Sequence, residues 1–405
     1  MSIRPMVSAL TRHRASVVIL VLEIALTFAV VSNAFALIMQ RVARLQLRTG
    51  LDDGSHLVYV NTAGTDRPDA GAIYATILDA LRRIPGVQSA AAVNTVPFGP
   101  REGTAGFDLD SAGTHFGRVA DFYYGAPGYL HVMGVRLIAG REFDPSAYRD
   151  FKVMPPSGGV IISQKLATLL WPEQNALGRS IWVGKEHHYQ VIGIAASVLR
   201  PDPGYAGIED AYDSLFLPAE LGAPQTGSYV LRTDPARRQA VLHAAYAAIQ
   251  RIDPRLVVDR DSSGSITDLR RVFEKNNRIM IGLLGGVIAA LMLVTGLGIM
   301  GLTGFWVQQR TRQIGVRRAL GARRVDILRY FQTENLLLAT AGIALGCAAA
   351  IGINVWLMAH YAVPRLPMMY LPIGAVVLWT LGQLAVLGPA LRAARVAPTT
   401  AMRSA

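Results

Sequence analysis

The sequence predicts an α-helical membrane domain of four transmembrane helices joined to an α+β extracytoplasmic domain. Over 405 residues the hydrophobic content is 51% and the mean hydropathy is +0.31, which suits a membrane protein with a large water-facing part. Residues 51–273 contain no apolar run of membrane-spanning length. A span needs roughly 20 apolar residues to cross a ~30 Å hydrocarbon core. Four runs meet that length, at residues 16–39, 279–307, 336–358 and 370–391.

The positive charge is concentrated in the short segments outside these runs. Residues 1–15, 310–333 and 392–405 together hold a basic excess equal to the whole net charge of +12. Short loops rich in Lys and Arg stay on the cytoplasmic side, so both termini and residues 310–333 are expected there, with 51–273 outside. Because the charge is explained by topology, nucleic acid is rejected as a partner. The first external loop departs from the rule, since Arg41, Arg44 and Arg48 follow the first run.

The first run also has a second interpretation as a cleaved signal peptide, because Ala34-Phe35-Ala36 matches a cleavage site. The run continues past that site and is long for a signal, which favours an uncleaved anchor. Glu23 inside it is costly in the bilayer. We expect it either to make a helix-helix contact across a dimer or to reach the cytoplasmic leaflet, and its ionisation state stays open.

Residues 51–273 show two similar β-α-β patterns. In each, a helix with an apolar stripe stands between two strand-like segments, which predicts one α+β core formed by both ends of the region. The two parts of the core are expected at about 51–127 and 219–273, with a mostly-β insertion at 128–218. Ser262-Ser263-Gly264-Ser265 suggests a flexible link back to the membrane. The segments are 56–62, 70–84 and 87–93 in the first unit, and 227–233, 235–252 and 255–258 in the second.

Small residues four apart recur in the later runs and predict close helix packing, because they let transmembrane backbones approach. The pairs are Gly282 with Gly286 and Gly342 with Gly346. With Glu23 they form the predicted set of packing residues, whose partner helices the sequence leaves open.

The segment between the second and third runs, residues 310–333, holds seven arginines and one acid, Asp326. Its apolar residues recur mostly three to five apart, which predicts helix, broken near Gly321. Such a basic amphipathic segment is typical of a helix lying on anionic lipid.

The wording of this segment resembles the cytoplasmic signature of FtsX-like permeases, the membrane subunits of MacB-type ABC transporters. Gln313 stands where that family usually has Glu. The outer region resembles the MacB-type periplasmic core domain and the end of the chain resembles the family's A-R-x-x-P ending, so the resemblance covers nearly the whole chain. The matching run is Arg312-Gln313-Ile314-Gly315-Val316-Arg317-Arg318-Ala319-Leu320-Gly321-Ala322, followed by Asp326-Ile327-Leu328.

The resemblance implies a multi-pass permease of the bacterial inner membrane that transmits ATP-driven movement to its periplasmic domain for export of drugs, peptides or lipoproteins. A dimer with itself or a similar permease, a separate ATPase carrying the ATP, a periplasmic adaptor and an outer-membrane duct are the implied partners. The chain itself is expected to bind no cofactor. Ile314, Val316, Ala319 and Leu320 are the expected apolar inserts. The implied ATPase-coupling residues are Arg312, Ile314, Gly315, Val316, Arg317, Arg318, Ala319, Leu320 and Gly321.

Two alternatives remain. The same mechanics would serve a signalling subunit that activates an envelope hydrolase, or the outer domain would itself be an anchored hydrolase. The sequence has no phosphate-binding G-x-x-x-x-G-K-[ST] loop and no H-E-x-x-H or G-x-S-x-G motif, so we expect no enzyme. His187 and His188 point to opposite faces if they lie on a strand, which disfavours a shared metal. Cys347 is the only cysteine, which excludes an intrachain disulfide.

Overall fold

The computed structural model describes residues 14–63, 70–151, 153–204, 207–223, 227–361 and 366–395. The chain divides into two compact units, which we call the helical unit and the α+β domain. The basic ends 1–13 and 396–405 lie outside the described residues, as do residues 362–365 between the third and fourth apolar runs. The helical unit comprises Met1–Val42 and Arg278–Ala405, and the α+β domain comprises Ala43–Asn277.

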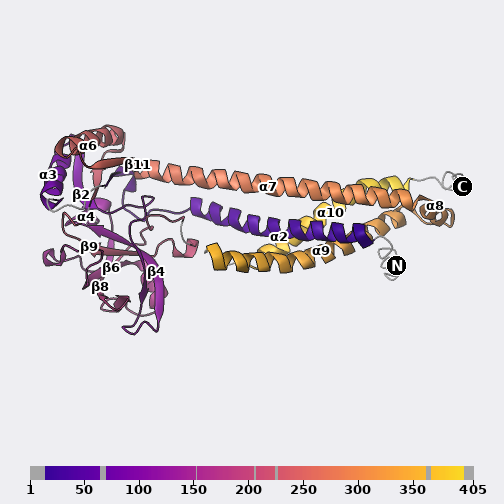
Figure 1. Ribbon diagram of the computed structural model, residues 1–405, viewed down its shortest axis with the longest axis horizontal. Coiled ribbons are helices and arrows are strands. Elements are labelled where there is room, and N and C mark those ends of the chain that lie inside the picture. Colours follow the sequence, from indigo (N-terminus) through magenta and orange to yellow (C-terminus); the bar gives the residue numbers. More distant parts are fainter. Residues whose placement is uncertain are drawn as a thin grey trace. The chain divides into compact units, whose positions relative to one another are not determined.

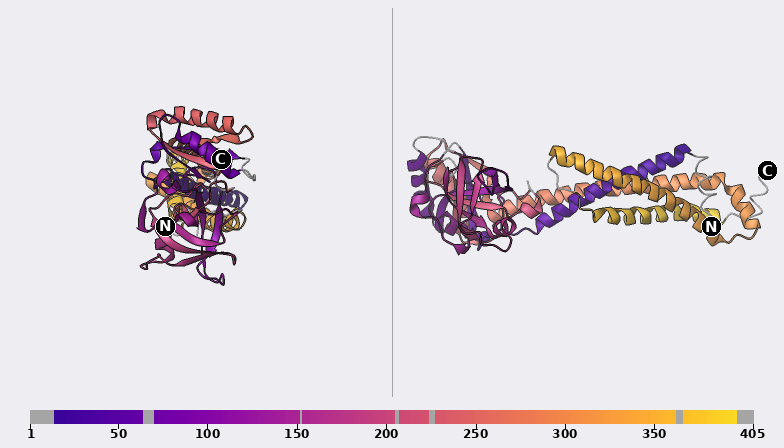
Figure 2. Two further views of the ribbon diagram at one scale, coloured as in Figure 1. Left: turned by 90° about the vertical axis from the view of Figure 1, so that its left-hand side faces the viewer. Right: turned by 90° about the horizontal axis from the view of Figure 1, so that it is seen from below.

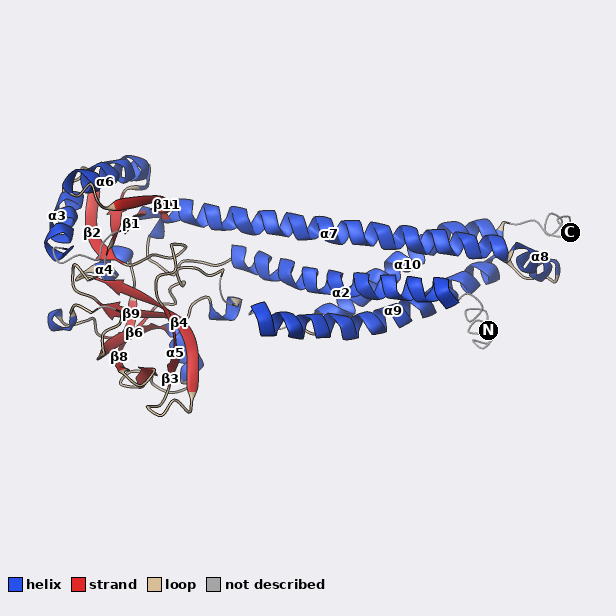
Figure 3. Cartoon of the chain, viewed as in Figure 1, coloured by secondary structure: helices blue, strands red, loops and turns tan. Residues whose placement is uncertain are grey.

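Four helices among the described residues are long and apolar enough to cross a membrane (Figures 1 and 3). All four extend beyond the apolar runs seen in the sequence, because hydropathy marks only the lipid-facing part of a helix. A short helix, α8, stands between the second and third. Pro389 lies inside the last helix. The helices are α2 Arg14–Leu45, α7 Ile266–Gln309, α8 Thr311–Ala319, α9 Arg324–Tyr361 and α10 Tyr370–Ala394.

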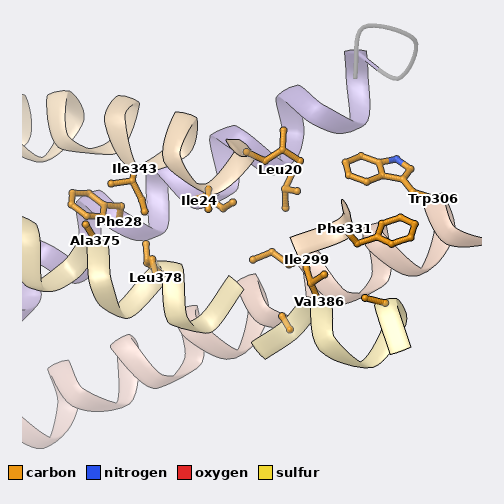
Figure 4. Close-up of a cluster of buried hydrophobic side chains, with 14 of the residues drawn as sticks. Leu20, Ile24, Phe28, Ile299, Trp306, Phe331, Ile343, Ala375, Leu378 and Val386 are labelled. Atoms are coloured by element: carbon orange, nitrogen blue, oxygen red, sulfur yellow. The ribbon is translucent and has the colours of Figure 1, made fainter. Parts of the chain in front are cut away.

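The helical unit is held by one apolar core. Ile24 and Phe28 of α2 are almost fully buried and belong to the same cluster as Ile343 of α9 and Leu378 of α10 (Figure 4). Helices α9 and α10 also run alongside each other (Figure 2). A buried hydroxyl pair, Thr27 Oγ1 to Thr295 Oγ1 at 2.8 Å, joins α2 to α7. Polar groups in hydrocarbon must pair within the protein, so this contact fixes which face α7 turns to α2.

The α+β domain contains strands β1 to β11 and helices α3 to α6. Its strands form one hydrogen-bonded sheet in the order β11-β1-β10-β2-β4-β3-β7-β8-β6-β9, with β5 on β8 and a further pairing of β4 with β9. The strands are β1 Leu57–Ala63, β2 Val87–Val93, β3 Thr104–Asp108, β4 Phe116–Gly125, β5 Leu137–Gly140, β6 Ser157–Ser163, β7 Ser180–Val183, β8 His187–Ala195, β9 Ser214–Pro218, β10 Ser228–Thr233 and β11 Val257–Ser265. The helices are α3 Ala70–Arg82, α4 Tyr129–Met133, α5 Gln164–Leu170 and α6 Arg238–Ile252.

The two predicted β-α-β units are present and interleave in one four-stranded segment of the sheet. β1 pairs antiparallel with both β10 and β11, and β10 pairs antiparallel with β2. Each unit is therefore a split β-α-β, with a strand of the other unit between its own two. α3 and α6 lie side by side (Figure 1), and Ile77 and Ile249 share a core with Val58 and Leu231. The mixed fold expected from the sequence is confirmed.

The mostly-β part closes on itself. β4 pairs with β3 and β9, and the pairings β3–β7, β7–β8, β8–β6 and β6–β9 complete a six-stranded ring. Alternate residues face its core: Phe122 and Tyr124 of β4 point inward, while Tyr123 between them packs on the other side. We expected the insertion to begin at residue 128. β3 and β4 precede that point yet belong to the ring, because their alternating apolar residues complete its core.

Buried ion pairs lock this ring. Arg200 is 1% exposed and donates from Nε and Nη2 to the two carboxylate oxygens of Asp121, at 2.8 and 2.7 Å. Arg118 donates from Nε to Asp213 Oδ2 at 2.6 Å. Burial raises the pKa of Asp213 even with Arg118 beside it. Buried pairs of this geometry specify one arrangement of their strands, since a broken pair leaves an uncompensated charge.

The junction between β11 and α7 contains no loop. Ser265 pairs with Val58 in the sheet, and its hydroxyl accepts from the backbone N–H of Asp268 at 3.1 Å. The hydroxyl also donates to the Asp268 carboxylate at 2.6 Å, so serine and acid cap the first turn of α7. The flexible link expected at residues 262–265 is therefore wrong. Gly264 and Ser265 pair with Tyr59 and Val58 of β1, and Ser263 lies in an irregularity of β11, where its hydroxyl accepts from the backbone N–H of Asn61.

Candidate functional site

The basic segment folds as a tight corner made of the end of α7, the short helix α8 and the start of α9 (Figure 1). Arg310 alone separates α7 from α8, with φ −100° and ψ 8°. The Thr311 hydroxyl donates to the carbonyl oxygens of Val307 and Gln308, at 3.0 and 2.8 Å. A hydroxyl bonded back onto the preceding turn bends a helix, which explains the change of direction here.

The break predicted near Gly321 is confirmed and has a defined geometry. Gly321 has φ +98°, in the left-handed region that glycine adopts without strain. Its N–H donates to the Arg318 carbonyl at 3.1 Å, and the N–H of Ala322 donates to the Arg317 carbonyl at 3.0 Å. These two bonds form a Schellman motif, which ends α8.

The next helix is started by the single acid of the segment. Asp326 Oδ2 accepts from the backbone N–H of Arg323 at 2.9 Å, at the first turn of α9. An acid in the first turn stabilises a helix start and satisfies an otherwise unpaired N–H. Asp326 therefore has a capping role, and the two helix ends of the corner are set by local signals.

The inner face of the corner is apolar. Ile314 is 5% exposed and lies in the core of the helical unit with Trp306, Ile327 and Phe331; Figure 4 shows Trp306 near Phe331. Gly315 is buried beside it. Ile314 was expected to insert into a partner protein. The structure corrects this, because a side chain already packed in its own core cannot be offered to another chain.

The corner also carries three large exposed apolar side chains, of which Val316 and Leu320 lie four residues apart at the end of α8 and so share a face. Leu320 at the end of α8 is 83% exposed, Val325 is 52% and Val316 is 45%. Ala319 and Gly321 are exposed beside them, as are Arg312 and Arg317, while Arg318 is half-buried. Exposed apolar groups gathered together and ringed by charge are typical of a protein docking surface. We call Val316, Ala319, Leu320 and Val325 the apolar tip.

Buried polar groups tie the corner together. Arg310 Nη1 donates to both carboxylate oxygens of Glu334, at 2.8 and 3.0 Å, and to the Tyr330 hydroxyl at 3.4 Å. The Arg317 guanidinium lies over the Tyr330 ring, 5.2 Å from its centroid. Glu334 is not among the predicted site residues, because it lies one residue beyond the basic segment 310–333. An acid at the edge of an apolar run was the signal that could have found it.

The predicted packing residues fall in two different environments. A Cβ built on Gly342 would lie 2.7 Å from Ile24 Cβ, and one on Gly346 would lie 2.8 Å from the Ala25 carbonyl, so both glycines lie against α2. Gly282 and Gly286 on α7 have no neighbour within 4 Å of such a Cβ. The Glu23 carboxylate lies against Gly298 of α7 in the same chain.

The α+β domain supplies no metal-binding cluster among its described residues. His187 Nδ1 bonds the Pro155 carbonyl at 3.1 Å, whereas His188 Nε2 bonds Ser180 Oγ at 3.1 Å and its ring packs on Trp182. The two histidines are neighbours on β8 and have separate partners, because successive side chains of a strand point to opposite faces.

Comparison with known families matches both units. The model of the MacB-like periplasmic core domain matches residues 17–249, and that of the FtsX-like permease C-terminal region matches residues 285–398. The chain belongs to the MacB/FtsX-like family of ABC transporter permeases. This permease is therefore a multi-pass membrane protein with a periplasmic-type domain.

Named relatives of this permease cover parts of it. The macrolide export ATP-binding/permease protein MacB of Bradyrhizobium diazoefficiens is 29% identical over 56% of the chain and 34% of its own length. The uncharacterized ABC transporter permease YknZ of Bacillus subtilis is 26% identical over 68% of this chain and 68% of its own length. The chain thus spans about a third of the length of the MacB relatives. The crystal structure of the extracellular domain of a YknZ transporter has a TM-score of 0.34 and 14% identity, covering 50% of this chain and 98% of that one.

Proposed function

We propose that this permease is the membrane subunit of an export machine driven by a separate ABC ATPase. The ATPase would carry the ATP and dock on the apolar tip, and the helices would pass its movement to the α+β domain. The observation that carries the proposal is the tip itself: Leu320 is 83% exposed at the end of a helix whose other face is locked in the core by Ile314. A fixed, desolvatable leucine surrounded by arginines suits a groove with an apolar floor and an acidic rim.

The distribution of charge supports the proposed topology. Residues 310–333 carry seven arginines and one acid, so α8 would face the cytoplasm with both termini. Four spans would then leave the α+β domain in the periplasm. This arrangement presents the tip to a cytoplasmic ATPase and the domain to exported cargo. Drug, peptide and lipoprotein cargo, with a periplasmic adaptor and an outer-membrane duct, are proposed from the family alone.

The second proposed partner is another permease, either a second copy or a similar chain. On α7, Thr295, Ile299 and Thr303 are buried, while Gly282, Gly286, Leu293 and Leu297 are exposed. The exposed side contains small residues four apart, the spacing that lets two transmembrane helices approach closely. A dimer through this side of α7 would place two tips beside two ATPases.

The test is affinity purification of the tagged permease from its native membrane in mild detergent. Wild type should retain an ATPase, identified by mass spectrometry and by ATP hydrolysis of the eluate. Val316→Asp with Leu320→Asp should lose it, because burying a carboxylate in the docking groove costs ~2 kcal/mol or more, about a 30-fold loss of affinity. Val257→Asp, the same change at an exposed valine of β11, is the matched control and should retain the ATPase.

Retention of the ATPase by the double variant would contradict docking at the tip. The alternative is that the basic corner lies on anionic lipid. In that case its arginines alone would hold it to the membrane, and Leu320→Asp would leave the binding of the purified permease to anionic vesicles unchanged.

A further inference from the structure

The connection between α7 and α8 is a single residue with helical bonds on both sides. The Arg310 N–H donates to the Trp306 carbonyl at 3.1 Å, and the N–H of Ile314 donates to the Arg310 carbonyl at 3.0 Å. The backbone is therefore a kinked continuation of α7, with one non-helical residue at the bend. Hinges are commonly a few element-terminal residues that absorb a backbone rotation, so Arg310 is the position at which α8 would turn relative to α7.

The Arg310 side chain is held by the third helix of the corner. Its guanidinium donates to both oxygens of Glu334 on α9, and the two side chains are only 13% and 2% exposed. The Tyr330 hydroxyl accepts a third bond, and the Trp306 ring lies 6.0 Å from the guanidinium carbon. The bend is thus tied to α7 by Trp306 and to α9 by Glu334 and Tyr330.

An ion pair this deep is a poor choice for stability alone. Apolar side chains of similar volume often stabilise a core as well or better, whereas a buried pair specifies one geometry. Here the pair specifies the direction of α8, because Arg310 immediately precedes the first turn of α8 and Arg317, in its second turn, packs on Tyr330 of α9. Neither Arg310 nor Glu334 belongs to the exposed tip.

We propose that Arg310 and Glu334 are the positioning pair that makes α8 move as one body with α7 and α9. The inference rests on the proposed function: force applied at the apolar tip reaches α7 because the bend at Arg310 cannot swivel. Without the pair, α8 still presents Val316 and Leu320 but turns at Arg310. The ATPase then binds and hydrolyses ATP while α7 stays still.

The experiment uses the full permease with its co-purified ATPase in nanodiscs. Hydrogen exchange is measured with and without ATP over residues 266–277, the first turns of α7. The variants are Glu334→Ala and Glu334→Gln, and Asp326→Asn is the matched control, because it alters the other acid of the corner, which contacts the Arg323 backbone. If Glu334→Ala lowers the unfolding temperature, Glu334→Gln, of nearly the same shape, carries the test.

The expected result is that both Glu334 variants capture as much ATPase as wild type and lose the ATP-dependent change in exchange, while Asp326→Asn keeps both. A full ATP-dependent change in the Glu334 variants overturns the proposal. Loss of ATPase capture together with the exchange change also overturns it, since the pair would then serve docking and not transmission. Failure of the proposed function is seen separately, as wild type that captures no ATPase.

Discussion

Two glycine pairs with the same spacing have opposite surroundings. Gly342 and Gly346 of α9 are filled by α2 of the same chain, with Ile24 and the Ala25 carbonyl within 3 Å of where a Cβ would stand. Gly282 and Gly286 of α7 face open space. Both pairs predict close packing of helices. The difference teaches that spacing identifies a face prepared for contact, while only the fold shows whether the chain itself occupies it.

The largest expected effect is at the filled pair. Gly342→Ala should lower the free energy of unfolding by about 1–3 kcal/mol, because the added methyl overlaps Ile24 Cβ on a rigid helix. Thermal unfolding in detergent, followed by tryptophan fluorescence, measures it. Gly282→Ala is the matched control and should cost nothing, since no atom lies within 4 Å of the new methyl. Equal effects at both sites would mean that α2 and α9 do not pack as described.

Substitution at the open pair should weaken the association of two permeases and leave the stability of the fold unchanged. Gly286→Leu leaves the fold intact but separates two α7 helices that approach through this side, so we expect weaker permease pairing with an unchanged unfolding temperature. Crosslinking between single cysteines placed at Val294, in a Cys347→Ala background, reports the pairing. Undiminished crosslinking would show that the partner uses another face and that the α7 glycines face lipid.

The smallest measurable loss of stability is expected at Gly298, whose surroundings lie between those of the two glycine pairs. A methyl there would stand 2.7 Å from both oxygens of Glu23, but these are the far end of a flexible side chain. Gly298→Ala should therefore cost less than about 1 kcal/mol. Adding Glu23→Ala should remove even that cost in the same unfolding assay; a larger loss in the double variant would show that the Glu23 carboxylate has a stabilising partner of its own.

The sequence predicted what local patterns determine. Apolar runs predicted four helices, and the alternation of strands and helices predicted the α+β core. Gly321 predicted the break before α9, because a glycine in the left-handed conformation ends a helix through hydrogen bonds to the preceding turn alone. The interleaving of the two β-α-β units was not predictable, since it depends on pairings such as β1 with β10 between distant residues.

The errors at the candidate site have one physical cause. Ile314 and Leu320 are both apolar residues of a basic helix, and only tertiary packing buries the first and exposes the second. Glu334 was missed because its partner, Arg310, lies on another helix. Residues 262–265 resemble a linker in composition, yet Gly264 and Ser265 pair with β1 in the sheet. The fold was therefore needed to tell the buried from the exposed residues of the basic segment, whereas the segment itself could be found from the sequence.

The capped start of α7 has a further consequence for how this family can vary in length. Ser265 fixes the first turn to a strand, and no loop interrupts the helix before Arg310. An α-helix rotates by about 100° per residue, so a single insertion there would change the direction of everything that follows by more than a quarter turn. Surface turns such as the one between β3 and β4 accept extra residues without such rotation. Homologous sequences should therefore gain and lose residues in those turns and keep α7 at constant length.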